Sequence, residues 1–535
     1  MTIDSFYEEV DKNNFYIGRV SQVYRDYCVV QVENLSILRP RSIYTESLIP
    51  NTINYLVVVD SAKGIFLGEV FQTKVSSSEK LHNPTNYGKP ENISPEINID
   101  IIGVMTYRDS KFKLSEFRTV GVSEKVYLAN RNIIEKYLES VEITRSTEKS
   151  LLPFATYLNR YDMEISLKAS TLFNHHLFVV GATNSGKSTS ALSVLDKVIK
   201  ARKKVIIIDP TGEYMDSFSP QEVTKLILGK DTTISPGKLT MQQWSMLFET
   251  NSVTQNSVLS EAIQSLRYQK KKGLCCRLEK VGKSPGEVQQ ELATLTEKDS
   301  DFNVSFLSEQ IAAESVSESS RKPTHYEYDT FKVNMNSYLI QKVKYQLSHS
   351  NFLKFFSHNP NSKDLIEELY LFLKTPNSSL YVNTSMLGLS DGIGGMVIDL
   401  ICSEVMGKNA ICPFVFFIDE VHRYTKSQSK EEFYEGLTRV AREGRKKGIF
   451  LFLTSQNPQD VSPTLLSQIG TLLIHRLTHN DEIRAIKNHL DDYSLRQIRK
   501  LNQGESVLTS INLMQNIFLK IIKCDRRQDN ETPFL

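Results

Sequence analysis

The stretch that decides the fold runs from residue 177 to residue 188 and reads Leu177-Phe178-Val179-Val180-Gly181-Ala182-Thr183-Asn184-Ser185-Gly186-Lys187-Ser188. Four apolar residues typical of a buried strand lead into a loop that holds two glycines, and the helical run 189–200 follows. In such a strand-loop-helix arrangement, backbone N–H groups and the helix N-terminus surround phosphate oxygens. A chance match to this pattern has a probability of about 2%, which makes an ordinary glycine turn before a surface helix the weaker interpretation.

This loop predicts a site for ATP and Mg²⁺. Lys187 is expected to reach the β and γ phosphate oxygens, and the Ser188 hydroxyl is expected to ligate Mg²⁺. The predicted nucleotide-binding residues of the loop are Gly181, Ala182, Thr183, Asn184, Ser185, Gly186, Lys187, Ser188 and Thr189.

A second apolar run, 414–418, ends in the two acids Asp419 and Glu420. Hydrolysis of a triphosphate requires a carboxylate that orients the metal and a residue that activates or orients the attacking water. We predict that Asp419 is a metal ligand and that Glu420 is the catalytic base. The alternative is a pair of acids that merely opens a loop after a core strand.

Two further candidates lie downstream of these acids. Gln456 follows the apolar run 449–453, and the carboxyl ends of strands in open α/β sheets are where ligands bind. We predict that Gln456 senses the γ-phosphate or the attacking water. The segment 439–448 is strongly basic, and its Arg442 or Arg445 could complete the site of a neighbouring subunit. The alternative for Gln456 is an ordinary polar loop residue, and the alternative for the segment 439–448 is a solvated basic helix.

Composition limits the other possibilities. Sixty-four Lys and Arg residues against 62 Asp and Glu residues leave a net charge of +2 in 535 residues, so no chain-wide basic field exists and any polyanion site must be local. One such local cluster, 267–280, carries six cations and one acid, and a solvated helical face is its alternative interpretation. Six cysteines without a CxxC pair exclude a disulfide scaffold and a zinc half-site of that type. Neither a signal peptide nor a membrane span is evident, so we expect a cytoplasmic protein without membrane association.

The chain divides by pattern into parts of different character. Short strand-like runs predict a small N-terminal β-barrel over 1–145, interrupted by a loop over 76–98. Buried strand runs that alternate with helical segments predict an α/β ATPase core with a parallel sheet over 146–215 and 376–500. A polar, mostly helical insertion is expected over 216–375, and a strand pair with a polar tail over 501–535.

Together these motifs resemble the HerA family of the HerA/FtsK P-loop ATPases. The resemblance rests on the phosphate loop, the segment 208–214 (Ile-Asp-Pro-Thr-Gly-Glu-Tyr), the acids 419–420 followed by His422, the segment 442–446 and the segment 454–458. Asn184 departs from the glycine that many relatives have, but asparagine tolerates a left-handed backbone, so we expect the loop to form. We identify the chain as a bacterial member, with an expected role in anti-phage defence or DNA end processing.

The resemblance implies a RecA-like core, a homo-hexameric ring with ATP sites between subunits, and double-stranded DNA in the central channel. It implies that Lys187 and Ser188 bind phosphate and Mg²⁺, that Asp419 and Glu420 are the hydrolytic acids, that Gln456 is the sensor, and that Arg442 or Arg445 acts in trans. Asp209 and Glu213 are expected to support the nucleotide site from the second strand.

Three functions remain open at this point. The first is an ATP-driven DNA translocase, similar to a helicase, that works with a separate effector, either a nuclease or a sirtuin-like NADase. The second is an ATP-dependent platform that assembles and activates the effector without productive translocation. The third, a conjugation-type secretion motor, is weaker because no membrane anchor is evident.

Overall fold

The computed structural model describes the chain except for residues 1, 8–10, 34, 44–45, 49–52, 76–93, 144–145, 159–162, 251–252, 322, 349–350, 357–361, 388–392, 426–434 and 529–535. Most of the predicted loop 76–98 therefore lies outside the described residues. The chain forms two compact units, which are described separately. The first comprises Met1–Glu148 and Thr509–Ile517, and the second comprises Lys149–Leu508 and Phe518–Leu535.

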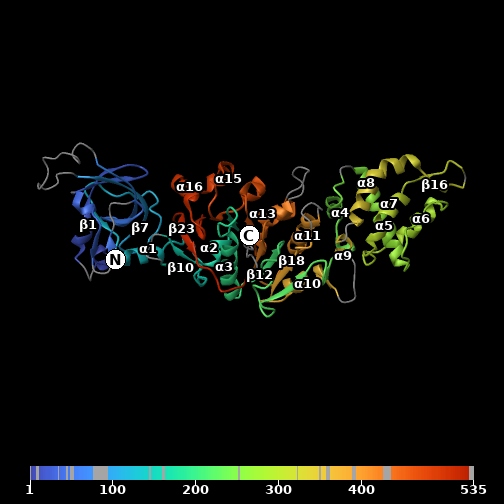
Figure 1. The fold of residues 1–535 in the computed structure, drawn as a ribbon, viewed down its shortest axis with the longest axis horizontal. Coiled ribbons are helices and arrows are strands. Elements are labelled where there is room, and N and C mark those ends of the chain that lie inside the picture. The colour runs from blue at the N-terminus through green and yellow to red at the C-terminus, as the bar shows by residue number, and fades with distance from the viewer. Residues whose placement is uncertain are drawn as a thin grey trace, which may run out of the picture. The chain divides into compact units, whose positions relative to one another are not determined.

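The first unit contains a closed barrel of six strands in the order β1-β2-β7-β6-β5-β8 (Figure 1). The strands are β1 (Tyr16–Val23), β2 (Cys28–Val32), β5 (Leu56–Ser61), β6 (Gly64–Lys74), β7 (Glu96–Met105) and β8 (Lys125–Leu128), and all neighbouring pairs are antiparallel. Apolar side chains such as Ile17, Val30 and Val58 are completely buried. The predicted small N-terminal β-barrel is confirmed.

Shorter elements accompany the barrel. They are η1 (Ile3–Phe6), η2 (Lys12–Phe15), η3 (Leu35–Leu38), the hairpin of β3 (Arg41–Ile43) and β4 (Glu46–Leu48), and helix α1 (Arg131–Leu138). Helix α1 begins after Asn130, whose side chain accepts a hydrogen bond from the N–H of Ile133, as expected of an N-cap asparagine.

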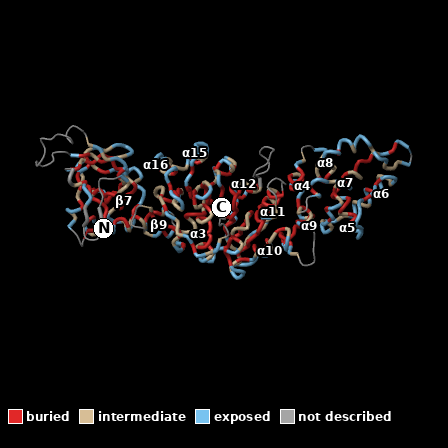
Figure 2. The backbone as a smooth tube through the Cα atoms, in the orientation of Figure 1, coloured by how far each residue is buried: buried red, intermediate tan, exposed pale blue. Residues whose placement is uncertain are grey.

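The second unit is built on an 11-stranded sheet with the order β10-β9-β23-β22-β21-β11-β20-β19-β12-β18-β13. The strands are β9 (Ala155–Tyr157), β10 (Glu164–Ile165), β11 (Leu177–Val180), β12 (Lys204–Asp209), β13 (Val223–Ile227), β18 (Ser379–Asn383), β19 (Phe414–Ile418), β20 (Ile449–Ser455), β21 (Thr471–Ile474), β22 (Glu505–Ser510) and β23 (Ile517–Ile521). The seven strands from β21 to β13 are parallel, and all residues of β11, β12, β18, β19 and β21 are buried (Figure 2, buried residues in red). The predicted α/β core of the RecA type with a parallel sheet is confirmed.

The strand order brings the functional loops to one edge of the sheet. Strand β11 lies between β20 and β21, and β19 lies between β20 and β12. In register, Val180 is opposite Ser455, and Ile418 is opposite both Leu453 and Ile208. Because these strands are parallel, the segments that follow β11, β12, β19 and β20 all leave the sheet at its carboxyl edge.

Helices pack against this sheet and against one another. They are α2 (Ala169–Phe173), α3 (Lys187–Lys200), α10 (Leu365–Lys374), α11 (Ile393–Gly407), α12 (His422–Thr425), α13 (Glu435–Glu443), α14 (Pro463–Leu466), α15 (Asn480–Ile486) and α16 (Asp492–Gln497), with short turns η9 (Gly444–Lys447), η10 (Pro458–Asp460), η11 (Lys487–His489) and η12 (Ile498–Lys500). Helix α3 follows the phosphate loop directly and buries the apolar face that includes Leu192, Leu195 and Val198. Within the described residues, no helix has the length and apolar character of a membrane span.

The interval 216–375 is mainly helical and shares its core with the sheet. It contains β13, the pair β14 (Thr232–Thr233) and β17 (Lys363–Asp364), the hairpin β15 (Val316–Glu318) and β16 (Tyr326–Tyr328), α4 (Met241–Leu247), α5 (Val253–Lys271), α6 (Pro285–Ala293), α7 (Leu307–Ala313), α8 (Thr330–Ser348), α9 (Phe352–Phe356), α10, and short turns η6 (Pro236–Lys238) and η7 (Val304–Phe306). Trp244 packs against Phe248, Phe302 and Phe356, and this aromatic group belongs to the same hydrophobic cluster as the strands. The second unit is therefore joined through a continuous core.

Candidate functional site

The phosphate loop follows β11 and uses backbone conformations that few residues adopt. Gly186 has φ of 104° and Asn184 has φ of 63°. A Cβ atom at Gly181 would lie 2.5 Å from both Cβ of His475 and Oγ of Ser185. The expectation that asparagine is compatible with the loop at 184 therefore agrees with a left-handed conformation at that residue.

Residues after β21 and before β22 hold the loop in place. The N–H of Ala182 donates to the carbonyl of Arg476 at 3.1 Å, and the N–H of Gly504 donates to the carbonyl of Ser185 at 2.9 Å. His475 is completely buried; its Nδ1 lies 2.9 Å from the carbonyl of Glu505, and its Nε2 lies 2.8 Å from the Ser190 hydroxyl. Burial lowers the pKa of His475 to about 4, so the ring is neutral at pH 7 and fastens α3 to the strands beside it.

The acids Asp419 and Glu420 occupy the predicted position at the end of β19. The hydroxyl of Thr454, on β20, donates to Oδ1 of Asp419 at 2.5 Å and accepts the backbone N–H of Glu420 at 2.9 Å. Burial raises the pKa of Asp419 to about 7, although nearby Lys187 acts in the opposite direction. A carboxyl in this environment holds a proton near neutral pH unless a cation replaces it.

Lys187, Glu420 and Gln456 meet directly at the carboxyl edge of the sheet. The Lys187 ammonium forms an ion pair with Oε1 of Glu420, and Nε2 of Gln456 donates to the same oxygen at 3.2 Å. The Thr183 hydroxyl donates to Oε1 of Gln456 at 3.1 Å, and Nδ1 of His422 lies 3.1 Å from Oε2 of Glu420. The structure therefore brings together Thr183 and Lys187 of the phosphate loop, the predicted base Glu420 and the predicted sensor Gln456.

The charge of Glu420 is set by these contacts. Burial would raise its pKa, but the contacts with His422, Lys187 and Gln456 outweigh burial and lower the pKa to about 2. Glu420 has φ of 44°, a backbone conformation that costs free energy in a residue with a side chain. An ionised carboxylate paired with an ammonium is a weak base. Glu420 can therefore act as a general base only after Lys187 has left it to pair with another anion.

The segment after β12 uses Asp209 as an internal anchor. Its Oδ1 accepts hydrogen bonds from the N–H groups of Thr211 and Gly212 at 3.0 and 2.7 Å, and its Oδ2 accepts from the Tyr214 N–H and the Tyr381 hydroxyl, both at 2.9 Å. The fully buried Asp209 therefore shapes the 209–214 turn and does not point its carboxylate at the phosphate loop.

Glu213 lies within electrostatic reach of the charged cluster. Burial, followed by the negative charge of Asp209, raises the pKa of Glu213, and Lys187 and Glu420 are also close enough to affect it. Its Oε2 accepts a hydrogen bond from Gln528 at 3.4 Å. Glu213, one of the two acids predicted on this segment, is therefore in electrostatic contact with the phosphate-loop lysine.

The predicted trans arginines lie apart from this cluster. Arg442 and Arg445 are both exposed, at the end of α13 and in η9, and Nη1 of Arg445 lies 3.0 Å from Nε2 of His175. Among the described contacts, neither arginine reaches Lys187 or Glu420. Within the part of the chain that the structure describes, neither Arg442 nor Arg445 completes the site of its own chain.

The donor set fits Mg²⁺ bound together with a nucleotide. Mg²⁺ is usually held by one or two protein oxygen ligands and completed by phosphate oxygens and water. Ser188 and Asp419 supply such oxygens beside the phosphate loop, and both are close enough to the buried Tyr214 to affect its ionisation. Across the described part of the chain, no group of three or more His, Cys, Asp or Glu residues forms a metal cluster, so phosphate oxygens would have to complete the coordination.

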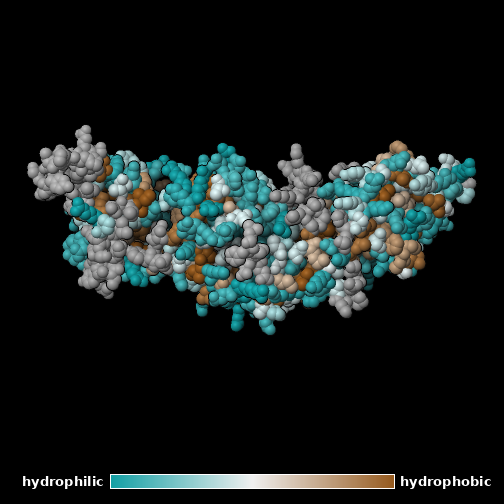
Figure 3. Space-filling model, viewed as in Figure 1, coloured by the Kyte–Doolittle hydropathy of each residue, from teal (hydrophilic) through white to brown (hydrophobic). Residues whose placement is uncertain are grey.

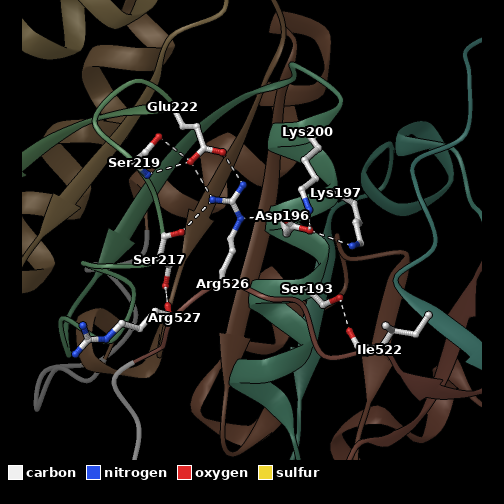
Figure 4. Close-up of polar contacts among 10 residues, drawn as sticks. All are labelled: Ser193, Asp196, Lys197, Lys200, Ser217, Ser219, Glu222, Ile522, Arg526 and Arg527. Carbon is white, nitrogen blue, oxygen red and sulfur yellow. Dashed lines mark hydrogen bonds and ion pairs between the residues drawn. The ribbon is translucent and has the colours of Figure 1, made fainter.

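The C-terminal segment is fastened to helix α3 near this site (Figure 4). The Arg526 guanidinium donates to Oδ1 of Asp196 at 2.6 Å and to both carboxylate oxygens of Glu222 at 3.0 and 2.6 Å. It also lies 4.8 Å from the centre of the Phe218 ring. Asp196 is completely buried, and Arg526 lowers the pKa of Glu222 to about 2. These contacts join α3, the segment after β12 and the chain end.

Three of the six cations in the basic cluster at 267–280 form ion pairs within the chain. Lys271 pairs with Asp299 at 2.8 Å, Arg277 pairs with Glu279 at 3.1 Å, and buried Lys280 pairs with Glu314. The Nε of Arg267 donates to the carbonyl of Asp299 at 2.7 Å. These contacts weigh against a phosphate-binding patch formed by all six cations. The solvated helical face describes only part of the cluster, because α5 ends at Lys271 and Lys280 is buried. Figure 3 shows hydrophilic residues over much of the visible surface, with smaller apolar areas between them.

Sequence reasoning missed several residues that shape the site. Their functions depend on contacts between distant segments: His475 contacts Ser190, 285 residues away, and Tyr381 contacts Asp209, 172 residues away. Thr454 and His422 carried a local signal, since each lies within two residues of a predicted catalytic side chain. Tyr214 belongs to the quoted segment 208–214, but its burial is visible only in the structure.

Two family models match most of the second unit. Residues 153–405 match the central domain of the helicase HerA, and residues 404–515 match the C-terminal domain of HerA-like helicases. These matches begin just before β9 and end between β22 and β23.

Individual relatives and a solved structure agree with these matches. A probable helicase of Methanocaldococcus jannaschii is 22% identical over 444 residues, which cover 79% of each chain. The DNA double-strand break repair helicase HerA of Sulfurisphaera tokodaii is 21% identical over 386 residues, 70% of each chain. The solved structure of VirB4 from Thermoanaerobacter pseudethanolicus is similar in fold, with a TM-score of 0.51 and 13% identity over 71% of this chain and 99% of that one.

Proposed function

Since the chain belongs to the HerA family of P-loop ATPases and is an ATPase, we propose that it works as a homo-hexameric ring that couples ATP hydrolysis to movement along double-stranded DNA. Several relatives are known or probable DNA double-strand break repair helicases, which supports DNA as the substrate of the motor. ATP and Mg²⁺ are the proposed cofactors.

One observation carries the proposal. Lys187 and Glu420 are 233 residues apart in sequence, and Glu420 and Gln456 are 36 apart, yet the three side chains meet at the end of parallel strands beside the phosphate loop. A lysine that binds phosphate, an acid that accepts a proton and an amide that detects the γ-phosphate are the parts that ATP hydrolysis requires.

The geometry suggests how these residues work together. Backbone N–H groups of the phosphate loop and the N-terminus of α3 would bind the phosphates. Lys187 would leave Glu420 for the β and γ oxygens, which raises the basicity of Glu420 and lets it accept a proton from the attacking water. Gln456, which contacts both Thr183 and Glu420, would link the position of the loop to that of the base. Ser188 and Asp419 would hold Mg²⁺, which would neutralise phosphate charge.

The trans role of Arg442 or Arg445 belongs to the same proposal. Both are exposed, Arg442 at the end of α13 and Arg445 in η9, and neither contacts Glu420 of its own chain among the described contacts. A permanently charged guanidinium supplied by a neighbour would make hydrolysis depend on ring assembly.

We further propose that the ring acts with a separate effector, either a nuclease or a sirtuin-like NADase, in anti-phage defence or DNA end processing in bacterial cytoplasm. The competing function is an ATP-dependent platform that activates the effector without productive translocation. The translocase and the platform differ in whether duplex DNA stimulates ATP turnover and in whether the ring moves along the DNA.

The test is the steady-state ATPase rate of the purified ring with and without linear duplex DNA, together with displacement of a protein roadblock from that DNA. The Glu420→Gln variant serves as the inactive control. A translocase shows DNA-stimulated turnover and ATP-dependent displacement. If DNA leaves the ATPase rate unchanged and the protein roadblock is not displaced, the proposal of a motor is overturned and the platform is favoured.

A further inference from the structure

Tyr214 is a completely buried residue of the segment that follows β12. Its N–H donates to Oδ2 of Asp209 at 2.9 Å, and its ring packs edge-on against Phe417, with ring centres 5.8 Å apart. Phe417 lies two residues before Asp419 on β19. The ring is therefore fixed from two strands, and its hydroxyl has little freedom to seek a partner elsewhere.

The Tyr214 hydroxyl makes no hydrogen bond of standard geometry within the described residues. Its polar neighbours include Ser188 and Asp419, the two predicted Mg²⁺ ligands. Burial keeps the pKa of the phenol well above its usual range, so the group remains a donor at neutral pH. A buried hydroxyl without a good hydrogen bond costs free energy, and such a cost persists in proteins mainly where the group has a function.

We propose that Tyr214 is a positioning residue of the metal–nucleotide site, whose hydroxyl hydrogen-bonds to Ser188 and orients the Ser188 oxygen beside Asp419 when Mg²⁺ and nucleotide bind. The inference rests on the proposed nucleotide site and adds to it a residue that touches neither phosphate nor metal. It explains why a tyrosine, rather than a phenylalanine of nearly the same shape, occupies a fully apolar contact with Phe417.

Tyr381 provides a matched control in the same region. It is also completely buried, and its hydroxyl donates to Oδ2 of Asp209 at 2.9 Å. Tyr214→Phe and Tyr381→Phe each remove one oxygen from a buried ring. Only the second removes a hydrogen bond of standard geometry, and only the first removes a neighbour of Ser188.

The first measurement is the thermal midpoint of each full-length variant in EDTA without nucleotide. Tyr381→Phe is expected to lower the midpoint, because Asp209 loses a donor. Tyr214→Phe is expected to leave it unchanged or raise it, because no good hydrogen bond is lost. An equal decrease in both variants would overturn the inference, because it would show that the Tyr214 hydroxyl is already satisfied.

The second measurement is the binding of a fluorescent ADP as Mg²⁺ is titrated. Tyr214→Phe is expected to lower the apparent Mg²⁺ affinity of the complex about tenfold, the usual effect of removing a partner of a metal ligand, while metal-free ADP binding is unchanged. Tyr381→Phe removes a hydrogen bond to Asp209 but no neighbour of Ser188, so it should lower the Mg²⁺ affinity less than Tyr214→Phe does. An unchanged Mg²⁺ affinity in Tyr214→Phe would overturn the inference, whereas a parent protein that fails to bind nucleotide would overturn the proposed site itself.

Discussion

The buried carboxyl of Asp419 gives the sharpest prediction. Burial moves its pKa from 3.8 to about 7, so the folded chain holds this proton more tightly than the unfolded chain does. For an acid whose pKa is raised by folding, stability is greatest while both states are protonated and falls as the pH rises from about 4 to 7. Ionised Asp419 therefore destabilises the metal-free protein at neutral and alkaline pH.

The substitution Asp419→Asn removes this cost. The asparagine carbonyl can still accept the hydrogen bond that the Thr454 hydroxyl donates to Oδ1 at 2.5 Å. The shift in pKa from 3.8 to about 7 corresponds to about 4 kcal/mol at pH 8 and to about 1–2 kcal/mol at pH 5. We expect the variant to be more stable than the parent by these amounts and to lose Mg²⁺-dependent nucleotide binding.

The assay is denaturant unfolding of both proteins at pH 5 and pH 8, in EDTA without nucleotide. Asp209→Asn is the control, because Asp209 is also completely buried but its carboxylate accepts hydrogen bonds on both oxygens. That variant should be less stable at both pH values, by at least about 2 kcal/mol. If Asp419→Asn and the parent responded identically to pH, the assignment of the bound proton to Asp419 would be wrong.

Three further predictions concern the cluster and its surroundings. Lys187→Ala should abolish nucleotide binding, whereas the Glu420→Gln protein should bind ATP and hydrolyse it about 10²-fold or more slowly. Nucleotide binding and single-turnover kinetics measure these effects. Normal turnover by Glu420→Gln would contradict the role of Glu420 as the base. Mixing Arg442→Ala subunits with Glu420→Gln subunits should restore part of the ATPase rate, and equal inactivity at every ratio would remove support for a trans arginine. Arg526→Ala should destabilise the second unit by about 3 kcal/mol at pH 7, because it breaks a buried ion pair with Asp196. This loss of stability should shrink toward pH 2 as the carboxylates are protonated. A loss of stability that does not depend on pH would contradict an electrostatic origin.

Most of the sheet could be predicted because its strands are continuous apolar runs. The expected apolar runs at 177–180, 414–418 and 449–453 correspond closely to β11, β19 and β20. Strand β13 was not predicted, because an edge strand that reads Val-Thr-Lys-Leu-Ile alternates in burial and lacks the apolar continuity of a central strand. Neither could the order of strands be predicted, because it depends on how all the helices pack over both faces.

The candidate site likewise has features that the sequence predicted and features that only the structure revealed. The loop 181–188 and the acids 419–420 were predicted from residues adjacent in sequence, because phosphate binding uses consecutive N–H groups and a strand end presents consecutive side chains. Asp209 was expected to support the nucleotide site. In the structure its carboxylate holds the 209–214 turn, which carries Glu213 and Tyr214, and the supporting role stays a prediction. That distinction depends on hydrogen-bond partners, which local sequence does not specify.

By itself, the sequence determined the chemical parts of this protein: a phosphate loop whose Asn184 and Gly186 adopt left-handed backbone, an acid pair after an apolar strand, and a barrel built from short alternating runs. Tertiary structure decided which parts meet. It placed Glu420 against Lys187, buried Asp419 deeply enough to raise its pKa to about 7, and enclosed the Tyr214 hydroxyl beside Ser188. The physical reason is that backbone conformation and apolar periodicity are encoded over a few neighbouring residues, whereas burial and charge pairing arise only when distant strands pack into one core.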